Sequence, residues 1–482
     1  MRPRQPAPSV PLALIALAGV AAAALILAGD WIAGLAVWVL WAGWRFLRTP
    51  EGPPVLALAF TFQWVQVTAG IFYYAVTGRR LGAMDLSDYR PMVLIGLGCL
   101  VAILLGLKAG LTLAQPRGGA PQAVPELELG WRGLLIAYLV CVALTGTVQE
   151  LAWRFPAVTQ GILALTYARL ALIFLMFRRL SQPRIRMGWT GLLLLTEVAL
   201  GFTGYFAGFR EPLMMAAVAL LGAFNRRRLH HWAVLGAVAV LMVSTGLMWM
   251  SVRTGHRHDL DSEALASSRE ERLERITSLS STWFKSSADE LFADMDFFVD
   301  RLWAVYYPAL AVGRVPVMLP HEHGAILGEA LYHIVTPRLL FPDKPVLPSD
   351  SEMVRKYAGV WVAGTEENTS IAFGYAAESY VDFGVPLMFG PIFVYALLLG
   401  LAYQWLLRAI RHRELGIALV TAVFWLSLYL FERSWIKHLG FTITLIVYLG
   451  GAAILMDRLL LFARRVRGRR ATHRAPLGRA AR

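Results

Sequence analysis

The stretch "TPRLLFPDKP", residues 336–345, places two cations among three prolines. Proline fixes its own φ angle, so the backbone around Arg338 and Lys344 loses little freedom on folding. A guanidinium and an ammonium group held in this way suit an anionic ligand. The alternative is a stiff surface turn in which Asp343 neutralises Lys344, and composition alone favours this alternative.

Residues that transfer protons precede this stretch. His323 follows His321 in "PHEHG", and His333 lies ten residues further on. An unperturbed histidine pKa of about 6.5 makes His323 and His333 candidate general bases at neutral pH. We predict no metal site, because histidines at i and i+2 share a face only on a strand, and no Cys or acidic cluster completes a zinc shell.

Two carboxylates follow the same stretch. Glu378 and Asp382, in "TSIAFGYAAESYVDFG", stand four residues apart and therefore share one face of a helix. Paired carboxylates perform acid/base chemistry or bind sugar hydroxyls, which makes Glu378 a further candidate catalytic residue. Carboxylates also cap membrane spans, and both interpretations stay open.

Arg210 lies between two apolar segments in the turn "GYFAGFREP". A guanidinium keeps its charge there, and Pro212 starts the next helix, whose N-terminal end favours anions. The turn is therefore a candidate seat for a lipid diphosphate. The alternatives are an ion pair of Arg210 with Glu211 or Glu150, or an Arg210 side chain that snorkels to the membrane interface. Arg154, in "ELAWRFP", is a further cation at the same predicted face.

Other charges also lie at or near membrane depth, where an ionisable group is costly. Glu197 in "LLLLTEVALGF" is interpreted as a protonated helix-packing residue rather than a proton relay. Glu432, Arg433 and Lys437 form the cluster "FERSWIKH", which maps to the outer face.

A membrane bundle must position these residues. Of the 482 residues, 57% are hydrophobic and 16% are charged, a composition that requires lipid around the chain. The net charge of +14 gathers at the ends of apolar runs, which fits membrane topology and argues against nucleic acid as a partner. Because a span needs about 20 apolar residues, we predict an all-α polytopic membrane protein with twelve transmembrane helices. Their ranges are 11–29, 31–47, 55–77, 91–114, 131–149, 161–177, 188–206, 212–225, 232–251, 386–407, 415–431 and 439–461.

Orientation follows from the positive-inside rule. With both termini cytoplasmic, the inner segments carry 26 Lys and Arg, against 7 in the short outer loops. The predicted domains are transmembrane helices 1–9 over 1–251, a mostly helical periplasmic loop domain over 252–385, transmembrane helices 10–12 over 386–461, and a basic cytoplasmic tail over 462–482. Within the loop domain we expect helices over 262–281, over 288–312 and immediately before the stretch 336–345.

The order of these motifs resembles the bacterial O-antigen polymerases, which join oligosaccharide repeat units. The matching features are the "GFR" turn between two spans, "GEALYHIVTPRLLFPDKP" in a long outer loop, and "TSIAFGYAAESYVDFG" leading into a late span. The resemblance covers mainly residues 200–400. It implies membership of the metal-independent, GT-C-like membrane glycosyltransferases, a group that also contains the O-antigen ligases.

The resemblance also implies a reaction. A glycan on undecaprenyl diphosphate is transferred, at the periplasmic face of the bacterial inner membrane, to a hydroxyl of another lipid-linked repeat unit. The product is O-antigen, exopolysaccharide or capsule, no cofactor is needed, and a flippase and a chain-length regulator are expected partners. Arg210, Arg338 and Lys344 match the basic residues that hold the diphosphate, with Arg154 as a further candidate, and Glu378 matches the Glu before the Phe-Gly pair.

Two other functions stay open. An O-antigen ligase uses the same chemistry on another acceptor, but it has a His beside an Asn or Ser where this chain has Glu367 and Asn368. A lipid-linked oligosaccharide transporter seldom needs so long an outer loop, and its charges line the midplane of the membrane. The acidic loop domain, with 12 Lys and Arg against 20 Asp and Glu, suits neutral sugars better than a polyanionic glycan. The acceptor base is left open among His321, His323, His333 and Glu378.

Overall fold

The structure of the protein is a computed structural model, and the part of the chain that it describes is helical. The described residues are 19, 29–48, 52–81, 88–115, 130–155, 158–181, 186–202, 210–225, 227–263, 288–337, 340–341, 343–345, 347–367 and 369–473. The predicted span 11–29 and the predicted helix 262–281 fall almost entirely outside these residues.

The helices follow one another along the whole described chain. They are α2 Trp31–Phe46, α3 Val55–Thr77, α5 Arg90–Leu113, α6 Trp131–Arg154, α7 Thr159–Thr166, α8 Ala168–Ser181, α9 Met187–Phe202, α10 Arg210–Gly222, α11 Leu229–Glu263, α13 Ala288–Leu302, α14 Tyr306–Arg314, α15 Ala325–Val335, α16 Asp350–Met353, α17 Tyr375–Phe383, α18 Phe389–Ala409, α19 Arg413–Leu428, α20 Trp435–Thr444 and α21 Gly451–His473. Short π-helical segments follow α16, at Val354–Ala358, and join α20 to α21, at Leu445–Gly450.

Several of these helices are long and apolar enough to cross a membrane, which makes the protein a polytopic membrane protein. Among the described residues there are seven such stretches: Val55–Thr77, Arg90–Leu113, Trp131–Arg154, Thr159–Ser181, Leu229–Met248, Phe389–Ala409 and Trp435–Ala463. The predicted spans 31–47, 188–206, 212–225 and 415–431 form apolar helices of 16, 16, 13 and 16 residues, shorter than the length used to predict a span. The predicted end of a span at residue 251 lies within α11, which continues to Glu263.

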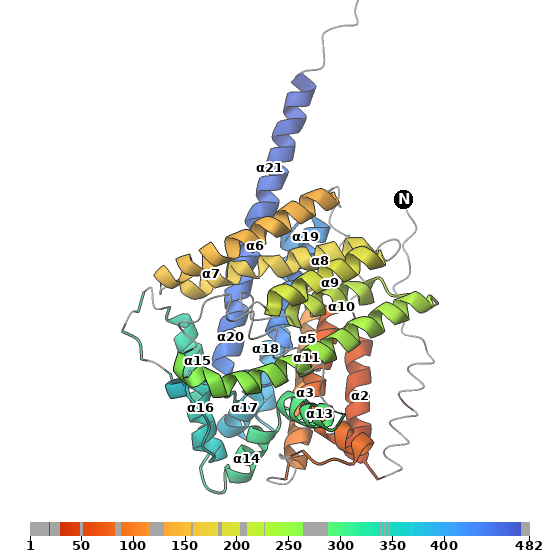
Figure 1. The fold of residues 1–482 in the computed structure, drawn as a ribbon. Coiled ribbons are helices and arrows are strands. Elements are labelled where there is room, and N and C mark those ends of the chain that lie inside the picture. The colour runs from red at the N-terminus through yellow and green to blue at the C-terminus, as the bar shows by residue number, and fades with distance from the viewer. Residues whose placement is uncertain are drawn as a thin grey trace, which may run out of the picture.

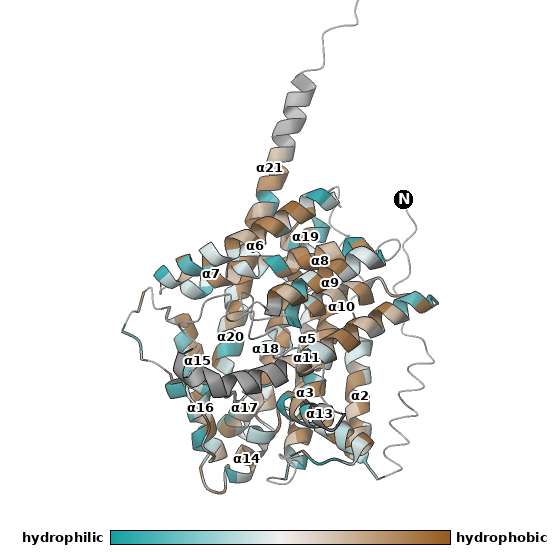
Figure 2. Cartoon of the chain, viewed as in Figure 1, coloured by the Kyte–Doolittle hydropathy of each residue, from teal (hydrophilic) through white to brown (hydrophobic). Residues whose placement is uncertain are grey.

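The loop-domain helices and the chain's last helix lie at opposite ends of the molecule. Figure 1 shows α14, α16 and α17 gathered toward one end of the bundle, while α21 projects from the other end. Apolar residues dominate the bundle helices, and polar residues are prominent around α16 (Figure 2). The apolar layer therefore lies between the polar helices of the predicted loop domain and the projecting part of α21 (Figure 1 and Figure 2).

Glycines allow two central spans to pack backbone to backbone. Gly106 and Gly110 on α5 face α18, and Gly400 on α18 approaches the carbonyl oxygen of Leu107 so closely that a Cβ at Gly400 would lie 2.6 Å from it. Small residues four apart permit this approach without a hydrophobic driving force between helices. The α5–α18 pair is therefore a rigid support for the elements that follow α18.

Helix α19 ends inside the protein, and two buried glutamines of α3 satisfy the backbone at that end. Gln63 donates to the carbonyl oxygen of Leu428. Gln66 Nε2 donates to the carbonyl oxygen of Tyr429 at 2.7 Å, and Gln66 Oε1 accepts from the Phe431 N–H at 3.1 Å. Helix ends leave backbone groups unpaired, and such groups are costly where water is absent.

The turn after α19, residues 429–434, joins the bundle to the loop domain. The N–H of Tyr375, at the start of α17, donates to the carbonyl oxygen of Arg433 at 2.8 Å. The Tyr375 hydroxyl donates to Gln63 Oε1 at 2.8 Å, and the indole N–H of Trp435 donates to Ser379 Oγ at 2.8 Å. The same turn is therefore bonded to both α3 and α17.

Replacing Gln66 by leucine tests this link. We expect Gln66→Leu to lower the free energy of unfolding by on the order of 2 to 4 kcal/mol, because two buried backbone groups lose their partners. The measurement is unfolding of the purified protein in mixed micelles titrated with SDS. The exposed Gln115 provides a matched control, and an equal loss in Gln115→Leu would contradict the assignment.

Candidate functional site

Helix α15 is held at both ends by charged side chains. At its start, the buried Asp382 carboxylate accepts hydrogen bonds from the backbone N–H groups of Ile326 and Leu327, at 3.0 and 2.8 Å. At its end, Lys344 Nζ donates to the carbonyl oxygens of His333 and Thr336, both at 2.8 Å. Negative charge at a helix N-terminus and positive charge at its C-terminus are both stabilising.

This geometry gives Lys344 a bracing role. The sequence offered two interpretations of "TPRLLFPDKP", an anion seat or a stiff turn. Lys344 folds back onto α15 and supports the turn, and Thr336 ends the helix as the stretch begins. Arg338, the other cation of the stretch, lies outside the described residues.

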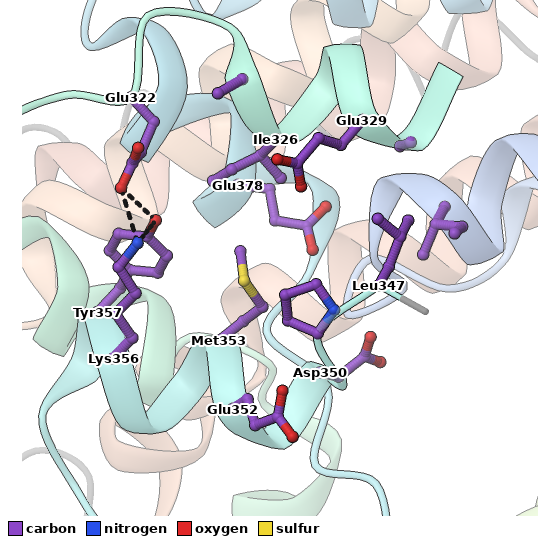
Figure 3. A pocket seen from close by; sticks show the side chains of 14 residues that line it. Glu322, Ile326, Glu329, Leu347, Asp350, Glu352, Met353, Lys356, Tyr357 and Glu378 are labelled. Carbon is purple, nitrogen blue, oxygen red and sulfur yellow. Dashed lines mark hydrogen bonds and ion pairs between the residues drawn. The ribbon is translucent and has the colours of Figure 1, made fainter. Parts of the chain in front are cut away.

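A cavity of about 410 Å³ lies beside α15, with walls from α16, α17 and α20. A second cavity of about 300 Å³ adjoins it and shares Glu329, Leu347 and Pro348. Figure 3 shows the labelled side chains around the first cavity, with Glu329 and Glu378 projecting into it. One ammonium group, that of Lys356, lines this cavity, together with five carboxylates: Glu322, Glu329, Asp350, Glu352 and Glu378.

Two of these carboxylates are bonded to lysines. Glu322 Oε1 accepts from Lys356 Nζ at 2.9 Å and from the Tyr357 hydroxyl at 2.6 Å, and these donors lower the pKa of Glu322. Asp350 accepts from Lys437 Nζ at 2.7 Å. The cavity wall is therefore locked by ion pairs on two sides.

Glu378 is the most deeply buried of the five, with 3% of its surface exposed. Its Oε2 accepts a hydrogen bond from the Trp435 N–H at 2.6 Å, which caps the first turn of α20. Burial, together with the nearby charges of Asp350 and Asp382, raises the pKa of Glu378 to about 8. At neutral pH the side chain is therefore mostly a neutral acid that lines the cavity.

A basic cluster lies on the other side of the turn 429–434. The guanidinium carbon of Arg433 lies 5.0 Å from the centre of the Phe441 ring and 5.6 Å from that of Tyr429, and its Nη1 donates to the carbonyl oxygen of Leu426 at 2.8 Å. Arg210 is the exposed first residue of α10. Both guanidinium groups are close enough to Tyr429 to act on its hydroxyl electrostatically.

The neighbouring Glu211 bears on the alternative interpretation of Arg210, in which Arg210 forms an ion pair with Glu211 or Glu150. Glu211 Oε1 accepts from the Tyr429 hydroxyl at 3.2 Å. The structure therefore shows a partner for Glu211 other than Arg210. Arg210 begins α10, and the Arg210 and Arg433 guanidinium groups, from distant parts of the chain, both act on Tyr429. A helix N-terminus with guanidinium groups in its vicinity is a favourable setting for a phosphate group.

The predicted site residues separate into distinct places. Glu378 lines the first cavity, and His333 and Lys344 line the second. His323 is exposed, has a left-handed backbone with φ of 53°, and is absent from the lining of both cavities. Arg154 is the exposed last residue of α6.

Glu197 has a cationic partner that the sequence interpretation did not include. It is bonded to the Arg169 guanidinium of α8 and to the Tyr138 hydroxyl of α6, and all three side chains are buried. Glu197 is therefore one half of a buried ion pair that joins α6, α8 and α9, rather than a lone protonated carboxyl group. This arrangement supports its predicted packing role.

Sequence reasoning assigned no role to Arg433 or Glu329. Arg433 was visible in "FERSWIKH", but its place beside Tyr429, on which Arg210 also acts, depends on the fold. Glu329 stands four residues before His333 on α15, and both line the second cavity. This helical spacing was the available signal. Among the described residues, no group of three or more His, Cys, Asp or Glu side chains is arranged to hold a metal ion.

Comparisons of the chain with protein-family models, curated proteins and solved structures gave no match.

The pKa of Glu378 predicts a pH dependence of stability. An unfolded Glu has a pKa of about 4.3, whereas burial raises that of Glu378 to about 8. The contribution of protonated Glu378 to the free energy of unfolding is therefore complete below about pH 4, and it is lost as the pH rises through 8. We expect the thermal unfolding temperature to fall between pH 5 and pH 9, and to fall less in Glu378→Gln, which stays neutral. Equal slopes in both proteins would refute this.

The brace on α15 is tested by Lys344→Met. Loss of the ammonium group costs the last turn of α15 about 1 kcal/mol, equivalent to roughly fivefold faster amide exchange if that turn frays. Hydrogen exchange with peptide mass spectrometry measures residues 331–337. Lys356→Met serves as the control, because Lys356 is bonded to Glu322 and not to that end of α15. Unchanged exchange in Lys344→Met would contradict the bracing role.

Proposed function

We propose that this protein polymerises undecaprenyl-diphosphate-linked oligosaccharide repeat units at the periplasmic face of the inner membrane. The observation that supports this proposal best is the turn 429–434 and its continuation into α20. This segment connects the region of Arg210 and Arg433 to the carboxylate-lined cavity beside α15. The first suits a diphosphate and the second suits sugar hydroxyls. The proposal includes twelve spans and cytoplasmic termini, as the distribution of Lys and Arg predicts.

The reaction is a glycosyl transfer. The bond between the anomeric carbon of the donor glycan and its diphosphate oxygen breaks, and a bond forms from that carbon to an acceptor hydroxyl oxygen. Undecaprenyl diphosphate leaves with the electron pair of the broken bond, and the hydroxyl proton passes to a base. Arg210 and Arg433 stabilise the charge that develops on the leaving diphosphate. The Arg433 guanidinium is held beside the Tyr429 and Phe441 rings.

The cavity residues divide the remaining roles. A neutral Glu378 cannot accept a proton at pH 7, so it serves as a hydrogen-bond donor to the sugar. His333, on the wall of the adjoining cavity, is the base whose type suits neutral pH. After the transfer, His333 releases this proton to solvent, which restores the base.

Arginine-to-lysine variants test the diphosphate site. A lysine keeps the charge but loses the planar fork that binds two oxygens at once. We expect Arg210→Lys and Arg433→Lys each to slow elongation of a purified lipid-linked repeat unit by about tenfold to a hundredfold. Product length is read on polyacrylamide gels, and protein level is measured in parallel.

Arg79→Lys is the matched control, because Arg79 is bonded to Asp296 away from the cluster. Elongation should also persist in EDTA. Failure of the wild-type protein to lengthen the repeat unit would refute the proposal, and transfer of glycan only to a lipid A core would identify a ligase instead.

A further inference from the structure

The cavity beside α15 retains negative charge after its internal pairing. Lys356 and Lys437 are bonded to Glu322 and Asp350. Within the described part of the chain, no ion pair is formed by Glu329, whose side chain is exposed. The Glu329 carboxylate is therefore available to interact with a ligand that enters the cavity.

Glu378 gives a second, independent indication of a ligand. Only one of its oxygens is used by the protein, through the Trp435 N–H. The side chain is 97% buried yet lines the cavity, and its second oxygen has no hydrogen-bond partner among the described residues. This oxygen is not enclosed by the protein, because it borders the cavity. A ligand hydroxyl can therefore bond to it without displacing a protein partner.

The size and the wall chemistry restrict the class of ligand. Cavities of about 410 and 300 Å³ are in the range of small-molecule sites. Ile326, Leu347 and Met353 supply apolar surface beside the carboxyl groups, as a sugar ring with one polar edge and one apolar face requires. A ligand carboxylate there would be repelled by ionised Glu329, at a cost that rises as water is excluded.

We propose that this cavity binds a sugar unit that is neutral or carries an ammonium group, and that Glu329 excludes sugars that carry a carboxylate. The saccharide character of the ligand rests on the proposed polymerase function. Glu329 accepts hydrogen bonds from ligand hydroxyl or ammonium groups. Glu378 donates to a hydroxyl oxygen, and its burial fixes the direction of that bond.

Three trisaccharides of similar size test the proposal: the glucosamine trimer, the N-acetylglucosamine trimer and the galacturonic acid trimer. Their binding is measured by titration calorimetry on the full-length protein in nanodiscs of zwitterionic lipid at pH 6. We expect the glucosamine trimer to bind most tightly, and the galacturonate trimer to bind at least tenfold more weakly than the neutral trimer.

Variants assign the selectivity to the cavity. Glu329→Gln should reduce the difference between the neutral and the acidic trimer to within about threefold, and because Glu329 is exposed the variant should fold. Glu378→Gln keeps an acceptor for the Trp435 N–H and a donor for the ligand, so it should bind all three trimers in the same order and within about threefold of the wild-type affinity. Glu367→Gln, an exposed loop-domain carboxylate outside both cavities, should change nothing.

The outcomes separate this inference from the proposed function. Binding of the galacturonate trimer as tight as that of the neutral trimer, no binding of any trimer, or an equal effect of Glu367→Gln would overturn the inference. Charge selectivity without elongation of any repeat unit would retain the saccharide site and refute the polymerase. Elongation that accepts uronate-bearing repeat units equally well would refute the selectivity alone.

Discussion

A helix that ends within a membrane protein leaves carbonyl and N–H groups that need partners, and α19 ends in this way at Leu428. Gln63 and Gln66 supply those partners from α3. Because the hydrogen bonds of these two glutamines are directional, they fix the path of the turn 429–434 and also pair its backbone groups. A leucine at either position would match the apolar bundle in composition, but it would leave the backbone groups of the turn without partners and its path undetermined. The two glutamines therefore determine the shape of the turn in addition to bonding its backbone.

Both chemical surfaces depend on that path. Arg433 lies within the turn and faces Tyr429 and Phe441. The N–H of Trp435, two residues later, donates to Glu378. A guanidinium cluster and a carboxylate-lined cavity would neutralise each other if their side chains met. The turn, with the buried indole of Trp435 beside it, separates them while keeping them adjacent in the chain. A substrate with an anionic end and a hydroxyl-rich end has the complementary arrangement.

The parts that the sequence predicted are those decided by local pattern. The span predicted over 55–77 forms α3 at Val55–Thr77 because a continuous apolar run lies between Pro54 and Gly78, which ends the helix with φ of 68°. The helix predicted immediately before "TPRLLFPDKP" forms α15, because its apolar residues have helical spacing and the proline-rich stretch ends it. Long-range pairing was not predictable: Gln66 meets Phe431 across 365 positions, and nothing local marks these two residues as partners. Arg433 and Glu329 were missed for the same reason.

Lys344 shows why residue type and position did not suffice even at short range. Its acceptors lie only eight and eleven residues away. However, a lysine among prolines is equally compatible with binding an anion and with capping a helix C-terminus, so residue type alone does not distinguish the two. The direction of the side chain decides between them, and that direction follows from the docking of α15 on α20 and from Asp382 at the opposite end of α15. With α15 fixed at both termini, Glu329 and His333 keep a constant spacing on one face. The two cavities that share Glu329 then have a common wall whose position changes only if one of the two caps is broken.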